Sequence, residues 1–169
     1  MKDISPPEVW MRGPISGIIQ ILQPVAHALL QASEEVSVIM EKFHDDLLWT
    51  TPAGVASVGF HLRHMKGVLD RLFSYSRSEI LSEQQLTYLR NEGIADPEIT
   101  HAELVAAFQN QIRVSIDYLK TIQEFQLTEV RGIGRKQIPT NVLGLLFHAA
   151  EHTQRHLGQL LVTAKVLIQ

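Results

Sequence analysis

Histidines recur at every fourth residue near the C-terminal end of the chain, at His148, His152 and His156. Residues four apart on an α-helix share one face, with Cβ atoms roughly 5–6 Å apart, so two neighbouring imidazoles of this series can bind one metal ion. The outer two are about 12 Å apart along a helix axis and cannot share an ion. The spacing therefore predicts one ligand pair, either His148 with His152 or His152 with His156.

A second group of histidines, His61 and His64, lies in another segment with helical character. Because they are three residues apart, they lie nearly on one face, and either one completes a three-histidine site if the two segments pack together. Three protein nitrogens leave coordination positions for water or substrate, as in catalytic sites, whereas four protein ligands close a structural site. The alternative interpretation is that all five are ordinary core or boundary histidines bonded to their neighbours.

Apolar residues recur at helical spacing in four segments that must position these histidines. They predict four long helices, at about 18–48, about 57–77, about 100–125, and from about 140 almost to the last residue. Pro24 lies inside the first segment, so that helix either begins at Pro24 or bends there. His27 follows one turn later and is a further candidate for the metal pocket. Thr100 and Glu103 have the spacing of a capping box, which predicts the start of the third helix.

The connection over residues 80–100 is long and contains a predicted short helix at 82–91, followed by Gly93 and Pro97. Such a crossover allows the second and third long helices to run parallel, as some helical bundles require. Residues 126–139 are expected to form a loop. The sequence therefore predicts an all-α fold, a four-helix bundle with a short extra helix in the crossover between helices 2 and 3.

The N-terminal residues 1–17 are rich in proline and glycine and predict an extended arm, whose Trp10 and Met11 are expected to dock on the bundle. The sequence shows no internal repeat and no linker. We therefore expect a single domain over residues 1–169.

Composition excludes several classes of function. The net charge is −3 and Lys and Arg form no run, so a nucleic-acid partner is not expected. The chain has no cysteine, which excludes disulfides, thiolate metal sites and a cysteine nucleophile. No apolar run approaches the roughly 18–20 residues of a membrane span, and the first residues lack the apolar core of a signal peptide. We therefore expect a soluble, cytoplasmic protein without a membrane partner.

The sequence as a whole resembles the DinB-like family, which consists of four-helix bundles proposed to be metalloenzymes. Most of the chain takes part in the resemblance. It is carried by four segments, at residues 57–64, 70–72, 134–140 and 151–159.

The family has a histidine triad, with one ligand from the second helix and an H-x-x-x-H pair from the fourth. The resemblance assigns these ligands to His64, His152 and His156, with a divalent ion such as Zn2+, Ni2+ or Fe2+. The remaining candidates for the pocket or for an alternative ligand are His61, His148 and His27. Two positions depart from the family pattern, because Leu157 replaces a common arginine and Arg155 replaces a frequent histidine.

Enzymes of this superfamily include metal-dependent thiol transferases and a thiol-dependent isomerase, and hydrolases have also been proposed. The resemblance therefore implies a metal-dependent transfer of a low-molecular-weight thiol to a small electrophilic substrate, and a homodimer. One alternative is a metal-dependent hydrolase. The other is a metal-binding or structural bundle without turnover, which would associate with itself through Trp10, Met11 and Trp49.

Overall fold

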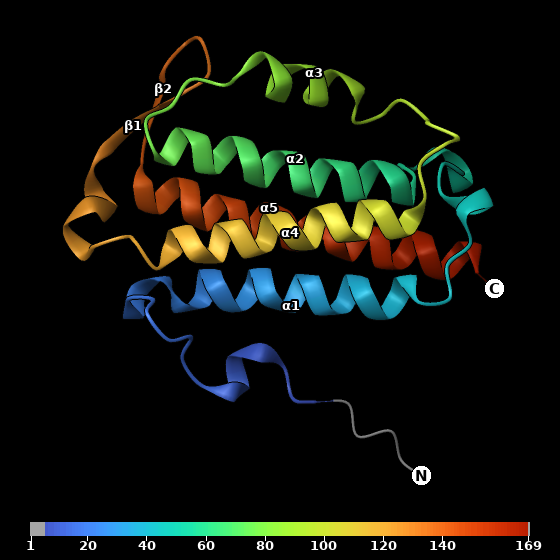
Figure 1. The fold of residues 1–169 in the computed structure, drawn as a ribbon, viewed down its shortest axis with the longest axis horizontal. Coiled ribbons are helices and arrows are strands. Elements are labelled where there is room, and N and C mark those ends of the chain that lie inside the picture. The colour runs from blue at the N-terminus through green and yellow to red at the C-terminus, as the bar shows by residue number, and fades with distance from the viewer. Residues whose placement is uncertain (1–5, 169) are drawn as a thin grey trace.

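Four long helices form the body of the protein in the computed structural model, which describes residues 6–168 (Figure 1). They are α1 (Gln23–Met40), α2 (Val58–Ser76), α4 (His101–Leu119) and α5 (Val142–Leu167). A shorter helix, α3 (Glu83–Asn91), lies in the crossover between α2 and α4, as predicted. The predicted four-helix bundle is therefore confirmed.

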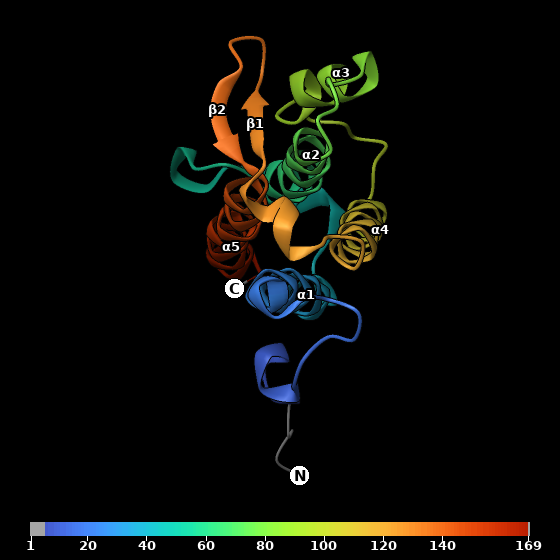
Figure 2. The same ribbon diagram turned by 90° about the vertical axis from the view of Figure 1, so that its left-hand side faces the viewer.

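Each long helix packs against two others, because α1 and α2 both contact α4 and α5 (Figure 2). The chain runs in one direction along α1 and α5 and in the opposite direction along α2 and α4 (Figure 1). The crossover makes this arrangement possible, because it returns the chain to the end of the bundle where α2 began. As a result α2 and α5, the two histidine-bearing helices, are antiparallel neighbours.

The core consists of apolar side chains that recur at three-, four- and seven-residue spacing on the inward faces of the helices. Fully buried examples from the four helices are Leu29 and Val36, Leu62 and Leu69, Phe108 and Leu119, and Leu146 and Leu160. These stripes hold α2 against α5 along most of their length. The packing thereby fixes which faces of these two helices meet.

The first helix is shorter than predicted at both ends. It begins at Gln23 with Pro24 in its first turn, where a missing N–H costs no helical hydrogen bond, so the proline starts the helix rather than bending it. It ends at Met40 rather than near residue 48. The sequence predicted a longer helix because Phe43 and Leu48 extend the apolar pattern. Both are buried, but they belong to the connection after the helix. Similarly, α4 ends at Leu119 rather than near residue 125.

A β-hairpin occupies the region that was expected to be a loop. Strand β1 (Val130–Ile133) pairs antiparallel with β2 (Ile138–Asn141), and Ile133 lies opposite Ile138. The turn between them includes Gly134 at φ 64°, a left-handed conformation that glycine adopts without strain. Asn141 also caps α5, because its side chain accepts a hydrogen bond from the Gly144 N–H. The hairpin and α3 lie on the side of the bundle away from α1 (Figure 2).

The N-terminal arm contacts the bundle through a different residue from those predicted. Val9 is buried, whereas Trp10 and Met11 are 59% and 58% exposed, so the prediction that these two dock on the bundle is wrong. The arm turns once in a short 3-10 helix (Val9–Arg12), which directs only Val9 inward. Residues 1–5 of the predicted arm lie outside the described residues. Within residues 6–168, no helix is both long enough and apolar enough to cross a membrane.

Candidate metal centre

Three histidines from α2 and α5 meet at one place in the bundle. His64, His152 and His156 each offer one ring nitrogen, and these nitrogens all lie within 4.8 Å of one another. The two α5 residues are one turn apart and share a face, and antiparallel packing places His64 opposite them. All three side chains are partly exposed. The centre therefore lies where solvent can reach it.

The imidazole of His64 is held on both sides. Its Nε2 lies 2.9 Å from Nε2 of His152, and its Nδ1 lies 2.7 Å from a carboxylate oxygen of Glu92. The ring also stacks on Phe60, with 5.2 Å between the ring centroids. A carboxylate accepts hydrogen bonds, so this contact favours a proton on Nδ1, which would leave the lone pair of Nε2 directed toward the other histidines.

Glu92, which the sequence did not predict to be near the centre, is the partner of His64. It follows the last residue of α3 and is 3% exposed, and its second oxygen accepts a hydrogen bond from Arg71 Nη1 at 2.6 Å. Glu92 is 28 residues from His64 along the chain and lies in the crossover, where no helical spacing relates the two. Only the folding of α3 over α2 brings them together.

The other two clustered histidines occupy supporting positions. His61 is 3% exposed, and its Nδ1 lies 3.1 Å from Nδ1 of His156. This contact leaves the opposite nitrogen of His156 available to a metal ion. His148 is more exposed, and its Nδ1 lies 3.3 Å from the carboxylate of Glu151. His148, Glu151 and His152 form a second group with metal-ligand spacing.

The remaining candidate, His27, belongs to neither group. Its Nε2 lies 3.1 Å from the Gly13 carbonyl, so it ties the N-terminal arm to α1. Trp49, which only the alternative of a self-associating bundle placed on a contact surface, is half-buried and makes internal contacts. Its indole N–H donates to the Asp96 carbonyl at 3.0 Å, and its ring packs against Arg63.

Burial keeps three of the clustered histidines neutral. The pKa of His61 and of His152 is lowered to about 4 and that of His156 to about 3, mainly by desolvation and to a smaller extent by the electrostatic effect of neighbouring histidines. A histidine must be deprotonated at the nitrogen that binds a metal, so proton competition at these positions is weak near pH 7. The site is thus prepared for a cation even though it contains no negative ligand.

The three residues fit a divalent metal ion. Two nitrogens bound tetrahedrally at about 2.0–2.1 Å are about 3.3 Å apart. The His64 and His152 nitrogens, at 2.9 Å, therefore need to separate by only a few tenths of an ångström. His152 Nδ1 is buried and has no hydrogen-bond partner among the described residues, so a small movement of this ring would break no hydrogen bond at that atom. Imidazole ligands suit Zn2+, Ni2+ and Fe2+.

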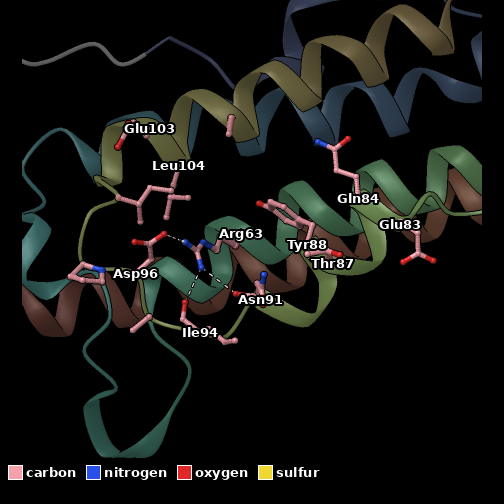
Figure 3. Close-up of a pocket in the computed structure, with 14 residues that line it drawn as sticks. Arg63, Glu83, Gln84, Thr87, Tyr88, Asn91, Ile94, Asp96, Glu103 and Leu104 are labelled. Carbon is pink, nitrogen blue, oxygen red and sulfur yellow. Dashed lines mark hydrogen bonds and ion pairs between the residues drawn. The ribbon is translucent and has the colours of Figure 1, made fainter.

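Two cavities lie near the residues of the centre. One of about 460 Å³ is lined by His61 and by the α5 residues that follow His156, including Gly158 and Gln159. A larger one of about 810 Å³ lies between the crossover and α4 (Figure 3), but no histidine of α2 or α5 lines it. We regard the smaller cavity as the candidate substrate pocket, because it alone of these two is lined by one of the clustered histidines, His61.

The fold and the site together define a four-helix bundle with a candidate mononuclear three-histidine metal centre. Residues 28–160 match the family model of the DinB superfamily, and the chain belongs to this superfamily. The resemblance seen in the sequence is therefore confirmed.

Several solved structures share this fold. A conserved protein from Enterococcus faecalis has 20% sequence identity and a TM-score of 0.71, with 89% of this chain and 98% of that chain covered. YfiT from Bacillus subtilis, described as a probable metal-dependent hydrolase with an unusual four-helix bundle topology, has 15% identity and a TM-score of 0.66, with 92% and 93% covered. At these identities the similarity establishes the fold alone. A search of curated proteins finds no significant match.

Proposed function

We propose that the protein is a metal-dependent enzyme in which His64, His152 and His156 bind one divalent ion. The observation that carries this proposal is the convergence of three ring nitrogens within 4.8 Å from two separate helices. The low pKa values of His152 and His156 support it, because both imidazoles stay neutral near pH 7. Zn2+, Ni2+ and Fe2+ are the ions that this ligand set favours.

Two features favour a catalytic over a structural site. The group contains three donors, and among the described residues it gains no fourth protein ligand. Coordination positions are thereby left for small molecules. In addition, His61 lines a cavity of about 460 Å³, and its Nδ1 lies 3.1 Å from Nδ1 of His156, so there is space for a small molecule near the centre.

We propose transfer of a low-molecular-weight thiol to a small electrophile as the reaction. When bound, the ion would favour the thiolate form of such a thiol, which is the nucleophile. Among the described residues, no unpaired carboxylate lies at the centre. Glu92 is buried and paired on both oxygens, and the hydrogen bond from Arg155 lowers the pKa of Glu151. A thiol needs less help than water to lose its proton, which favours thiol transfer over hydrolysis.

A metal-dependent hydrolase is the second candidate. YfiT, which shares the fold, is described as a probable metal-dependent hydrolase. The carboxylate of Glu151 lies beside His148 and His152, at a position from which it can accept a proton from a water molecule. In this candidate Glu151 has a direct role, whereas thiol transfer does not require it. The homodimer implied by the family resemblance stays a prediction.

The experiment combines metal analysis with two substrate panels. Metal-stripped protein is loaded with Zn2+, Ni2+ or Fe2+, and its metal content is measured after dialysis. The loaded forms are then tested with low-molecular-weight thiols and an aromatic halide, and separately with esters and amides. We expect one ion per chain and thiol conjugation, both lost in His156→Ala and both retained in the matched control His27→Ala.

Each other outcome identifies an alternative. Ester or amide hydrolysis that depends on Glu151 supports the hydrolase. One bound ion without turnover on either panel supports a metal-binding bundle without catalysis. Protein that holds no ion, in wild type and His156→Ala alike, contradicts the proposal.

A further inference from the structure

We propose that Glu92 is a positioning residue for the metal centre, which fixes His64 in the Nδ1–H tautomer and directs its Nε2 toward His152 and His156. This inference rests on the proposed function, because it assigns Glu92 a role toward the same centre. The carboxylate would act through His64 and would not contact substrate.

A chain of two short hydrogen bonds determines the tautomer. Arg71 Nη1 donates to one oxygen of Glu92 at 2.6 Å, and His64 Nδ1 lies 2.7 Å from the other oxygen. An arginine can only donate hydrogen bonds, and a carboxylate can only accept them. The direction of the chain is therefore fixed from Arg71 outward, and the proton of the neutral His64 ring must be on Nδ1.

The ion pair between Glu92 and Arg71 is buried in the packed interior. Glu92 and Arg71 are 3% and 8% exposed. A buried carboxylate is costly unless an opposite charge and hydrogen bonds compensate it, and Arg71 and His64 provide both. Gly67 supplies the space, because a Cβ on this residue would overlap the Glu92 carboxylate and lie 2.7 Å from Arg71 Nη1. Glycine at position 67 of α2 therefore leaves room for the Arg71–Glu92 ion pair to lie against the helix.

The backbone that carries Glu92 is also anchored to α2. Arg63 donates to the carbonyls of Asn91 and Ile94, at 3.1 and 2.8 Å, and to the Asp96 carboxylate at 3.0 Å (Figure 3). These contacts hold the chain on both sides of Glu92. Arg63 immediately precedes His64, so the helix that presents the ligand also fixes its partner.

Such an arrangement has a measurable consequence for metal affinity. A hydrogen-bond partner that orients a metal-binding histidine and fixes its tautomer typically changes metal affinity about 10–100-fold when it is replaced. If the Arg71–Glu92 ion pair had only a structural role, replacing Glu92 would change stability but would leave the tautomer of His64 unaltered. The tautomer therefore separates the two roles.

The test uses Glu92→Gln and nitrogen-15 NMR of the histidine rings in the metal-free protein. In wild type we expect the proton of His64 on Nδ1, with the signal assigned by its loss in His64→Ala. In Glu92→Gln, Arg71 keeps the amide oxygen, so the amide NH2 faces His64 and donates to Nδ1. The proton of His64 should then move to Nε2, and zinc affinity measured by competition with a chromophoric chelator should fall about 10–100-fold.

The control is Glu34→Gln, which makes the same change in the Arg12–Glu34 pair on the protein surface. It should leave both the tautomer and the zinc affinity unchanged. A His64 proton on Nε2 in wild type overturns the inference, even if Glu92→Gln fails to fold. An unchanged tautomer in folded Glu92→Gln also overturns it. If wild type binds no zinc, the proposed function fails, while the tautomer still tests the role of Glu92.

Discussion

Replacing Gly67 with alanine has two opposite effects on stability, a gain in helix propensity and a steric overlap with Glu92. Gly67 is buried in the interior of α2, where alanine is more favourable than glycine by about 0.8–1.0 kcal/mol on helix propensity alone. The added Cβ, however, would overlap the Glu92 carboxylate and lie 2.9 Å from Tyr88 Cε1. Neither Glu92 nor Arg71 can swing into solvent, because both are buried. The substitution must therefore displace the buried ion pair.

The magnitude follows from the cost of disturbing such a pair. Removing one partner of a buried ion pair costs about 3–5 kcal/mol, and a displaced pair that keeps part of its contact costs roughly 2–4 kcal/mol. After subtracting the gain in helix propensity, Gly67→Ala should lower the free energy of unfolding by about 1–3 kcal/mol. For a domain of this size, Tm should fall by about 3–10 °C.

Urea denaturation of the metal-free protein measures this change, and Gly158→Ala is the matched control. Gly158 lies in the interior of α5, and no neighbouring atom lies within 4 Å of the position that a Cβ would take there. The helix propensity therefore acts alone, and stability should rise by up to about 1 kcal/mol. If Gly67→Ala is as stable as Gly158→Ala, the proposed packing of Glu92 against α2 is refuted.

Two further predictions concern acid stability and helix capping. Because burial lowers the pKa of His152 to about 4 and that of His156 to about 3, the unfolded chain binds more protons than the folded protein between pH 6.5 and those values. The metal-free protein should therefore lose stability as pH falls through this window. Calorimetry should show this loss as a falling Tm. A Tm that does not change with pH in this window would contradict the burial of these two histidines. Thr100→Ala removes the side chain that caps α4, which accepts from the Glu103 N–H, and should cost about 1 kcal/mol. An unchanged urea midpoint would show that this cap contributes nothing.

Local signals made the helices predictable from the sequence. The second helix was expected at about residues 57–77 and extends over Val58–Ser76, because its buried residues follow the helical period without interruption. The capping box at Thr100 correctly marked the start of α4. Helix ends were less predictable where apolar residues such as Phe43 continue into a buried connection. The hairpin strands have four residues each, which is too short for a clear alternating pattern.

The supporting shell of the centre depends on tertiary structure. The sequence alone left His61 and His64 as alternatives because both lie near one face of α2, and only the packing of α2 on α5 distinguishes their positions. Glu92 gave no signal at all. Its contacts require α3 to fold back over α2 and Gly67 to leave space, and neither condition is visible as a spacing in the chain.

The central claim is that His64, His152 and His156 bind one metal ion. Anomalous diffraction from crystals of the zinc-loaded protein, recorded on both sides of the zinc absorption edge, tests it most directly. We predict one anomalous peak per chain, about 2.0–2.1 Å from a ring nitrogen of each of the three histidines. A peak between His148, Glu151 and His152, or no peak after loading, would contradict the assignment.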